Sequence, residues 1–281
     1  VSTNSRKAFK STNDGSNWAE LPLTLSSPIT QFAFDTIGTA GNLYGAAGNV
    51  GLVKSSNGGQ NWSIIDTSRL FGSSVISIAC SKNGILHLAT NKGYMRSTNA
   101  GNSFELLLSD IVFTSVLVDK DNQTIIYIGS SSGKASLRGF YRSTNGGATF
   151  SENLSPGLNC YRLSQAHNGN LYKINASAPD EIDKSTDKGV TWITFDSTPS
   201  STRAIIESSS TNEFFAAGFN GIFRTTNGGM NWVNYNMNNS ILSLFIVGNK
   251  LFAGANSVIT GLIVTSLNPV LISNTDTPVA D

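Results

Sequence analysis

The chain has 281 residues, a net charge of +1 and only 13 % charged side chains, about half the usual share. Its Lys and Arg residues are dispersed, so it lacks the clustered positive charge of a nucleic-acid-binding protein. It also lacks any apolar stretch of about 18 residues, the length that spans a membrane. We therefore expect no nucleic-acid partner and no membrane span.

Short apolar runs alternate with turns rich in Asn, Gly and Asp from the N-terminus onward. The first run, residues 7–10, leads into the corner S-T-N-D-G-S-N-W at residues 11–18. Near-copies of this corner begin at Ser55, Ser97, Ser143, Ser185 and Thr225, with start-to-start steps of 44, 42, 46, 42 and 40 residues. A fixed period in this range indicates a repeat architecture.

Four positions of the corner are fixed: Ser or Thr, then Asn or Asp, then Gly, then Trp or Phe. We expect the Asn or Asp side chain to accept a hydrogen bond from the backbone amide two residues on. The glycine supplies a positive φ, the hydroxyl satisfies another turn amide, and the aromatic ring seals the gap between packed sheets. These positions are therefore expected to be structural and not a ligand site. They are Ser11, Asn13, Gly15, Trp18, Ser55, Asn57, Gly59, Trp62, Ser97, Asn99, Gly101, Phe104, Ser143, Asn145, Gly147, Phe150, Ser185, Asp187, Gly189, Trp192, Thr225, Asn227, Gly229 and Trp232.

Two further strands are predicted between successive corners, from short β-branched or aromatic runs bounded by turn residues. In chain order these runs are 29–34 and 42–47, 75–80 and 85–89, 114–118 and 125–129, 160–163 and 170–174, 203–207 and 214–218, and finally 241–246, 250–254 and 261–266. Asn83-Gly84 and Asn168-Gly169 are hairpin signals, and no stretch shows a sustained helical period. Four antiparallel strands in roughly 43 residues match one blade of a β-propeller.

The six corners resemble the Asp-box, or BNR repeat, of sialidases, sortilin-type receptors, xyloglucanases and photosystem II assembly-factor propellers. The resemblance covers residues 1–266 and implies an all-β fold, a single β-propeller of four-stranded antiparallel blades. It also implies that the corners lie at the periphery, between the third and fourth strands of each blade. Residues 267–281 are expected to be a C-terminal linker or tail, similar to the stretch before the sorting domain of type IX secretion substrates.

The number of blades depends on how the ring closes. We count 25 predicted strands, whereas six four-stranded blades need 24 and seven need 28. We favour six blades, with residues 241–254 supplying the inner strands of a shared closing blade and residues 7–21 supplying its outer strands. With six blades, the predicted strand at 261–266 has no place in a blade. Seven blades is the alternative, if residues precede Val1.

No catalytic constellation is found in the sequence. A glycosidase needs two carboxylates facing one pocket, but no acidic pair recurs at the starts of the predicted first strands. The arginine triad and F/Y-R-I-P signature of sialidases are also absent. His87 lies in an apolar strand and is expected in the core, and neither it nor His167 has metal-ligand spacing. We predict no catalytic residue, no metal and no cofactor, and we expect Cys80 and Cys160 to be buried thiols.

Two long loops, 130–138 and 175–181, are predicted between second and third strands of consecutive blades. Loops on a rigid scaffold are where binding residues concentrate, although neutral surface insertions are an equal alternative. The candidate binding residues on these loops and on the nearby inner strands are Lys134, Arg138, Tyr161, Arg162, Asp180, Glu181 and Arg203.

The sequence thus favours a non-catalytic binding or scaffold propeller whose partner is an unknown glycan or protein. The alternatives are a glycoside hydrolase and a protein-complex assembly factor. Polarity that comes from Ser, Thr and Asn, and a start at Val1 without an apolar leader, are expected of a processed bacterial protein that is secreted or held at the cell surface.

Overall fold

The computed structural model describes the fold over most of the chain. The described residues are 6–13, 15–35, 41–151, 153–155, 157–175, 181–194, 199, 201–208, 212–235, 240–247, 250–255, 258–265 and 268–275. In these ranges the structure consists of β-strands and two short 3-10 turns, η1 (Thr67–Leu70) and η2 (Ala135–Leu137). None of the described residues forms a helix long and apolar enough to cross a membrane. The predicted all-β class is confirmed.

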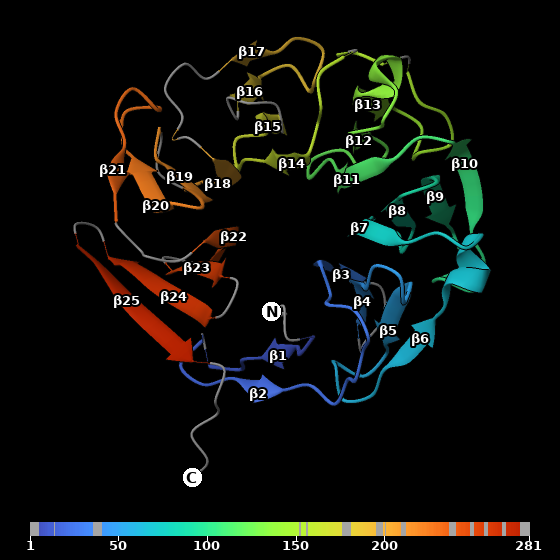
Figure 1. The fold of residues 1–281 in the computed structure, drawn as a ribbon, viewed down its shortest axis with the longest axis horizontal. Helices are drawn as coiled ribbons and strands as arrows, with labels where there is room; N and C mark the ends of the chain where they lie inside the picture. Colours follow the sequence, from blue (N-terminus) through green and yellow to red (C-terminus); the bar gives the residue numbers. More distant parts are fainter. Residues whose placement is uncertain are drawn as a thin grey trace.

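Antiparallel sheets follow one another around a common centre, with the first strand of each large sheet innermost (Figure 1). Five sheets have four strands each. They are β3 (Gln31–Asp35), β4 (Asn42–Ala46), β5 (Leu52–Ser55) and β6 (Ser63–Ile65); β7 (Val75–Cys80), β8 (Leu86–Thr90), β9 (Gly93–Ser97) and β10 (Glu105–Ser109); β14 (Arg162–Gln165), β15 (Leu171–Asn175), β16 (Glu181–Ser185) and β17 (Ile193–Thr194); β18 (Thr202–Glu207), β19 (Phe214–Gly218), β20 (Gly221–Thr225) and β21 (Val233–Asn234); and β22 (Ile241–Val247), β23 (Lys250–Ala255), β24 (Val258–Thr265) and β25 (Asn268–Thr275).

Two smaller sheets complete the arrangement. One contains β11 (Phe113–Val118), β12 (Ile126–Ser130) and β13 (Gly139–Ser143). Two backbone bonds, from Ser151 N to Arg142 O (2.8 Å) and from Leu154 N to Phe140 O (2.8 Å), stand in place of its fourth strand. The other sheet contains only β1 (Phe9–Lys10) and β2 (Ala19–Glu20).

The last sheet differs from the predicted shared blade. β23 pairs with β24, and β24 pairs with β25, so residues 258–275 supply the two outer strands beside β22 and β23. The strand left over at 261–266 lies in β24, and β25 falls within the stretch expected to be a linker. Residues 7–21 form the separate β1–β2 pair instead. The physical reason is proximity in the chain, because a strand that follows β23 directly closes a far shorter loop than one from the N-terminus.

All six corners form the same hydrogen bonds. In the corner between β13 and the segment after it, Ser143 Oγ accepts from Gly147 N (2.9 Å) and from Asn145 N (3.3 Å). The corresponding hydroxyl-to-glycine bonds elsewhere measure 2.8–3.0 Å. Each fixed glycine has a positive φ, as predicted. The Asn prediction is corrected: Asn145 Oδ1 accepts from Thr149 N, four residues on (3.0 Å), whereas the amide two residues past Asn145, Gly147 N, donates to Ser143 Oγ.

The corner aromatics pack against the preceding sheet. Phe150 lies edge-on to Tyr94 of β9, with ring centroids 4.7 Å apart, and Trp192 lies edge-on to Phe140 of β13 at 4.9 Å. Buried clusters accordingly span neighbouring sheets, for example β3–β6 with β7–β10. The corners are therefore the contacts through which one sheet is fixed to the next.

His87 is fully buried, as predicted, and is hydrogen-bonded on both sides. Its Nε2 lies 2.7 Å from Ser81 Oγ and its Nδ1 lies 2.7 Å from the Tyr94 hydroxyl. Burial, with a smaller contribution from Arg96, lowers the pKa of His87 to about 3. A methyl group on Gly147 would overlap the Tyr94 hydroxyl, so this pair supports the corner of the next sheet.

Substitution of neighbouring corner glycines separates backbone strain from packing. Gly146 and Gly147 both have positive φ, but a methyl group on Gly146 meets nothing within 4 Å. We expect Gly146→Ala to cost about 1 kcal/mol of unfolding free energy from left-handed strain alone. We expect Gly147→Ala to cost about 2 kcal/mol more, because Tyr94 is held by His87 and has no room to move. Urea denaturation measures the unfolding free energy of each variant. Equal losses of stability in the two variants would contradict the packing role of the corner.

The buried imidazole predicts a specific acid sensitivity. His87 has a folded pKa below its unfolded value of about 6.5. As the pH falls from about 6.5 towards 3, the unfolded chain binds a proton that the folded chain excludes, so stability falls. His87→Gln removes this titration and keeps a hydrogen-bonding side chain. Between neutral pH and about pH 4.5, the free energy of unfolding should fall by about 2–3 kcal/mol more in the wild type than in the variant. Parallel stability–pH curves would refute the assignment.

Candidate binding site

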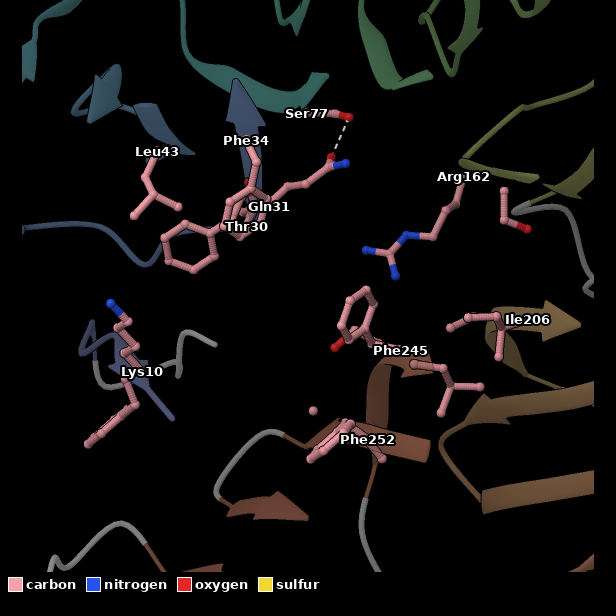
Figure 2. A pocket seen from close by; sticks show the side chains of 18 of the residues that line it. Lys10, Thr30, Gln31, Phe34, Leu43, Ser77, Arg162, Ile206, Phe245 and Phe252 are labelled. Carbon is pink, nitrogen blue, oxygen red and sulfur yellow. Dashed lines mark hydrogen bonds between the residues drawn. The ribbon is translucent and has the colours of Figure 1, made fainter. Parts of the chain in front are cut away.

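A cavity of about 1450 Å³ lies at the centre of the sheets. All six innermost strands, β3, β7, β11, β14, β18 and β22, contribute residues to its wall, and β1, β4 and β23 extend it outward (Figure 2). The cavity is larger than a typical small-molecule site of roughly 300–1,000 Å³.

Gln31, Ser77 and Ser115 occupy equivalent register positions on β3, β7 and β11, and each forms hydrogen bonds to the next inner strand. Gln31 Oε1 accepts from Ser77 Oγ (2.6 Å) and Ile78 N (3.4 Å) on the next inner strand. Ser77 Oγ accepts from Val116 N (3.1 Å), and Ser115 Oγ accepts from Leu163 N (3.1 Å). These polar groups already have backbone partners, so their main role is to hold the strands around the cavity.

Arg162 occupies the same register position on β14 and departs from the pattern. It is paired with Ile174 as Ser77 is paired with Ala89, and the residue at this position on β18 is the small Ala204. The guanidinium extends into the cavity (Figure 2), and Nη1 donates to Leu242 O of β22 (2.7 Å). Within the described residues it forms no ion pair. Burial, together with nearby Arg203, lowers the pKa of Arg162.

Two more of the predicted binding residues lie next to Arg162. The Arg203 guanidinium lies 4.3 Å from the centroid of Phe219 and 6.0 Å from that of Tyr161. Tyr161 is half exposed and lines the cavity. The structure therefore brings Tyr161, Arg162 and Arg203 together at one side of the centre.

The other predicted residues lie away from the cavity lining. Lys134 and Arg138 flank the 3-10 turn η2, and Arg138 Nε donates to Ser132 O within its own loop (2.7 Å). Glu181 is an exposed residue at the start of β16, paired with Asn175. Asp180 lies outside the described residues. Residues 176–180, most of the second long loop, also lie outside the described residues.

Sequence reasoning missed the apolar walls of the cavity. Phe34 on β3 and Phe245 on β22 are 65 % and 63 % exposed, which is unusual for phenylalanines on innermost strands. Their cross-strand partners Leu43 and Phe252 line the same cavity. Aligning the repeats by register would have marked these positions as inner-strand residues but would not have shown their exposure.

Charged groups are few in the lining that the structure describes. Lys10, Arg162 and Lys250 are the cations, and Asp35 is the carboxylate. Asp35 is nearly buried and accepts from Asn42 Nδ2 (3.2 Å). Among the described residues no group of three or more potential metal ligands occurs. Both cysteines are free thiols; Cys160 is buried as predicted, whereas Cys80 is only partly buried, and burial raises the pKa of each to about 12.

Comparison with known proteins gives the fold. No family model matches the sequence, and no curated protein matches it. Among solved structures, the GH74 enzyme of Niastella koreensis has a TM-score of 0.73 and 19 % identity, covering 94 % of this chain and 50 % of the enzyme. The GH74 xyloglucanase from Xanthomonas campestris has a TM-score of 0.72 and 16 % identity, covering 93 % and 49 %. The structure of YCF48 bound to D1 peptide has a TM-score of 0.65 and 17 % identity, covering 91 % and 84 %.

The chain thus spans about half the length of the GH74 enzymes that it matches. Sequence identities this low establish similarity of fold, and the fold shared by these proteins is a β-propeller. The expected group of propellers is therefore supported at the level of architecture.

The exposed phenylalanines predict a measurable surface property. Replacing Phe34 and Phe245 together by Ser should lower the fluorescence of a bound apolar dye such as ANS, because both rings face the cavity. Stability should change by less than about 1 kcal/mol, since little buried area is lost. Val233→Ser is the matched control, because Val233 is also 63 % exposed but lies on the outer strand β21. An unchanged dye signal would show that these rings are not accessible.

Proposed function

We propose that this chain is a non-catalytic propeller that binds a segment of a partner protein in its central cavity, acting as a scaffold or assembly subunit. The observation that carries the proposal is the cavity itself, large and walled by exposed phenylalanines, with one inward-pointing guanidinium. The proposal includes the location expected from composition, outside the cell or on its surface.

The chemistry of the walls favours a peptide over a glycan. Phe34, Leu43 and Phe245 present apolar surface, which suits the apolar side chains of a polypeptide. Sugar hydroxyls need many hydrogen-bonding partners when they leave water. Ser77 and Ser115, which line the cavity, already bond to neighbouring backbone amides.

The charge of the lining favours a segment with an acidic group. Among the described lining residues the carboxylate of Asp35 already accepts from Asn42, and Lys10 Nζ already donates to Gly58 O (2.9 Å), so Arg162 is the cation that carries this preference. Arg162 bonds only to a carbonyl within the described structure, so its remaining N–H donors are suited to a carboxylate. An acidic side chain or a chain terminus of the partner would satisfy them.

Fold comparison supports the same choice. YCF48, which shares the fold over most of its own length, was solved with the D1 peptide bound. The similarity to GH74 enzymes keeps glycoside hydrolysis as the second candidate. That chemistry requires two carboxylates around one bond, and the described lining of this cavity contributes Asp35 alone.

Selection from a random peptide display library, run beside a glycan array, tests the proposal. Peptides rich in apolar residues with at least one acid should be enriched. Arg162→Gln should lower the affinity for the selected peptides by about tenfold or more, because a charge-assisted hydrogen bond is lost. Arg69→Gln, an exposed arginine on η1 that is away from the cavity, should leave binding unchanged.

Two results would contradict the proposal. One is enrichment of glycans with no enrichment of peptides. The other is hydrolysis of a glycoside that is abolished by replacing a single carboxylate.

A further inference from the structure

Arg203 is held in place by aromatic rings and not by hydrogen bonds. It is the extra residue of a bulge in β18, where the pairing with β19 shifts between Thr202 and Ala204. Its guanidinium lies over Phe219, 4.3 Å from the ring centroid, and 6.0 Å from that of Tyr161. Among the described residues it has neither a hydrogen-bond acceptor nor a carboxylate partner. Its N–H donors therefore remain available to a ligand.

The equivalent positions in other sheets form hydrogen bonds that hold the fold. Thr114 is the extra residue of the bulge in β11, and its Oγ1 donates to Cys160 O (2.7 Å) at the start of the next sheet. Asn91 occupies the turn position of Phe219, and its Oδ1 accepts from Ser74 N (2.8 Å). In the β18–β21 sheet, an arginine lying over a half-exposed ring stands in place of both bonds. Such a local departure from the structural pattern is expected where a chain binds a ligand.

Arg162 lies beside Arg203 and also has donors to spare. It extends into the cavity from β14, and only its Nη1 donates within the described structure, to Leu242 O (2.7 Å). Burial and the neighbouring Arg203 lower its pKa, so the two positive charges oppose each other. By contrast, Arg96 lies against Glu105, with 3.0 Å between Nη2 and Oε2. Two adjacent guanidiniums with no anion among the described residues indicate a site for an anionic group.

We infer that Arg162 and Arg203 form one site for two carboxylates that lie close together on the partner segment, and that Arg203 sets this preference. The inference rests on the proposed function and adds a second residue and a second charge to it. A guanidinium binds a carboxylate through two parallel N–H bonds, so each arginine can hold one carboxylate. A single carboxylate would leave one of the two cations without a counter-charge.

Two kinds of segment carry such a pair of carboxylates. In an extended chain, acidic residues two positions apart point to the same side. An acidic residue at a C-terminus carries both its side-chain carboxylate and the terminal carboxylate. Both kinds offer the same chemistry to the two arginines, and peptides of each kind distinguish them.

Succinate, which carries two carboxylates on a flexible link, is the simplest probe. Succinamate is its matched control, because one carboxylate is replaced by an amide of the same size. The arginine Nε–H signals of the isotope-labelled whole chain are followed by NMR at constant ionic strength, and those of Arg162 and Arg203 are the signals missing in the corresponding Gln variants. Both signals should shift saturably with one dissociation constant, and succinamate should bind at least about tenfold more weakly. No saturable shift, or equal affinity for succinamate, would overturn the inference.

Two substitutions test the role of Arg203. Arg203→Gln should lower the affinity for succinate by about tenfold or more, because the second guanidinium is lost. Phe219→Ser keeps both charges and removes a half-exposed ring that fixes Arg203, so the affinity should fall by about threefold or more. Arg69→Gln, on η1, should leave the affinity unchanged. Equal affinities of the wild type, Arg203→Gln and Phe219→Ser would refute the role of Arg203.

Short apolar peptides identify the source of the two carboxylates. V-E-I-E-V is compared with V-E-I-Q-V, both blocked at their ends, and V-I-V-E with a free C-terminus is compared with its amide. In at least one comparison the peptide with two carboxylates should bind about tenfold more tightly, and that comparison gives the source. Equal binding within both comparisons would contradict the inference.

The result also separates this inference from the proposed function. Displayed peptides that lose affinity in Arg162→Gln but keep it in Arg203→Gln would sustain the proposed function and overturn the site for two carboxylates. Failure to select any peptide, together with failure of succinate to bind, would overturn both.

Discussion

The bond between a corner hydroxyl and the glycine amide four residues on is the interaction on which the architecture depends. It fixes a third strand to a fourth and holds the glycine at a positive φ. The glycine then lies against the preceding sheet with no room for a side chain, and the next aromatic ring is placed against that same sheet. Six repetitions at nearly constant spacing set a succession of sheets around one centre. The corner hydroxyls and glycines bond to each other, and the corner residues Ser11, Gly15, Trp18, Gly59 and Trp62 also line the outer part of the cavity.

The candidate binding groups lie on the innermost strands of the sheets. Gln31, Ser77 and Ser115 hold one inner strand to the next through backbone amides, and this leaves a cavity whose frame is polar but internally satisfied. Arg162 and the phenylalanines of β3 and β22 are the groups with unused binding capacity. A frame of this kind suits an extended apolar partner, because Gln31, Ser77 and Ser115 already have partners; of the described lining, Ser164 Oγ is a buried hydroxyl without one.

Much of the fold was predictable from the sequence because corner chemistry and strand periodicity are local. The strand positions, the positive φ of the glycines and the buried environment of His87 follow from residues close in sequence. The Asn side chain was assigned the wrong amide, because the Ser143 hydroxyl and the Asn145 side-chain oxygen compete for the same backbone N–H groups and only geometry decides between them. The outer strands of the last sheet were missed because loop closure, and not strand propensity, selects β24 and β25.

The candidate site was less predictable, because it depends on long-range packing. Tyr161, Arg162 and Arg203 were identified from their inner-strand positions, whereas the exposure of Phe34 and Phe245 depends on which sheets flank them. Lys173 is a similar case, since an apolar position in other repeats here holds a buried lysine 3.1 Å from Asp183 across β15 and β16. No local sequence pattern reveals this ion pair, because Asp183 is brought opposite Lys173 by the pairing register of β15 and β16.

Amide hydrogen exchange at the corner glycines tests the central claim most directly. If the hydroxyl bond fixes each sheet to its neighbour, the amides of Gly59, Gly101, Gly147, Gly189 and Gly229 should exchange as slowly as amides in central strands such as β8. Exchange of these amides at the rate of exposed loops, while the central strands stay protected, would show that the corners are not what holds the sheets together.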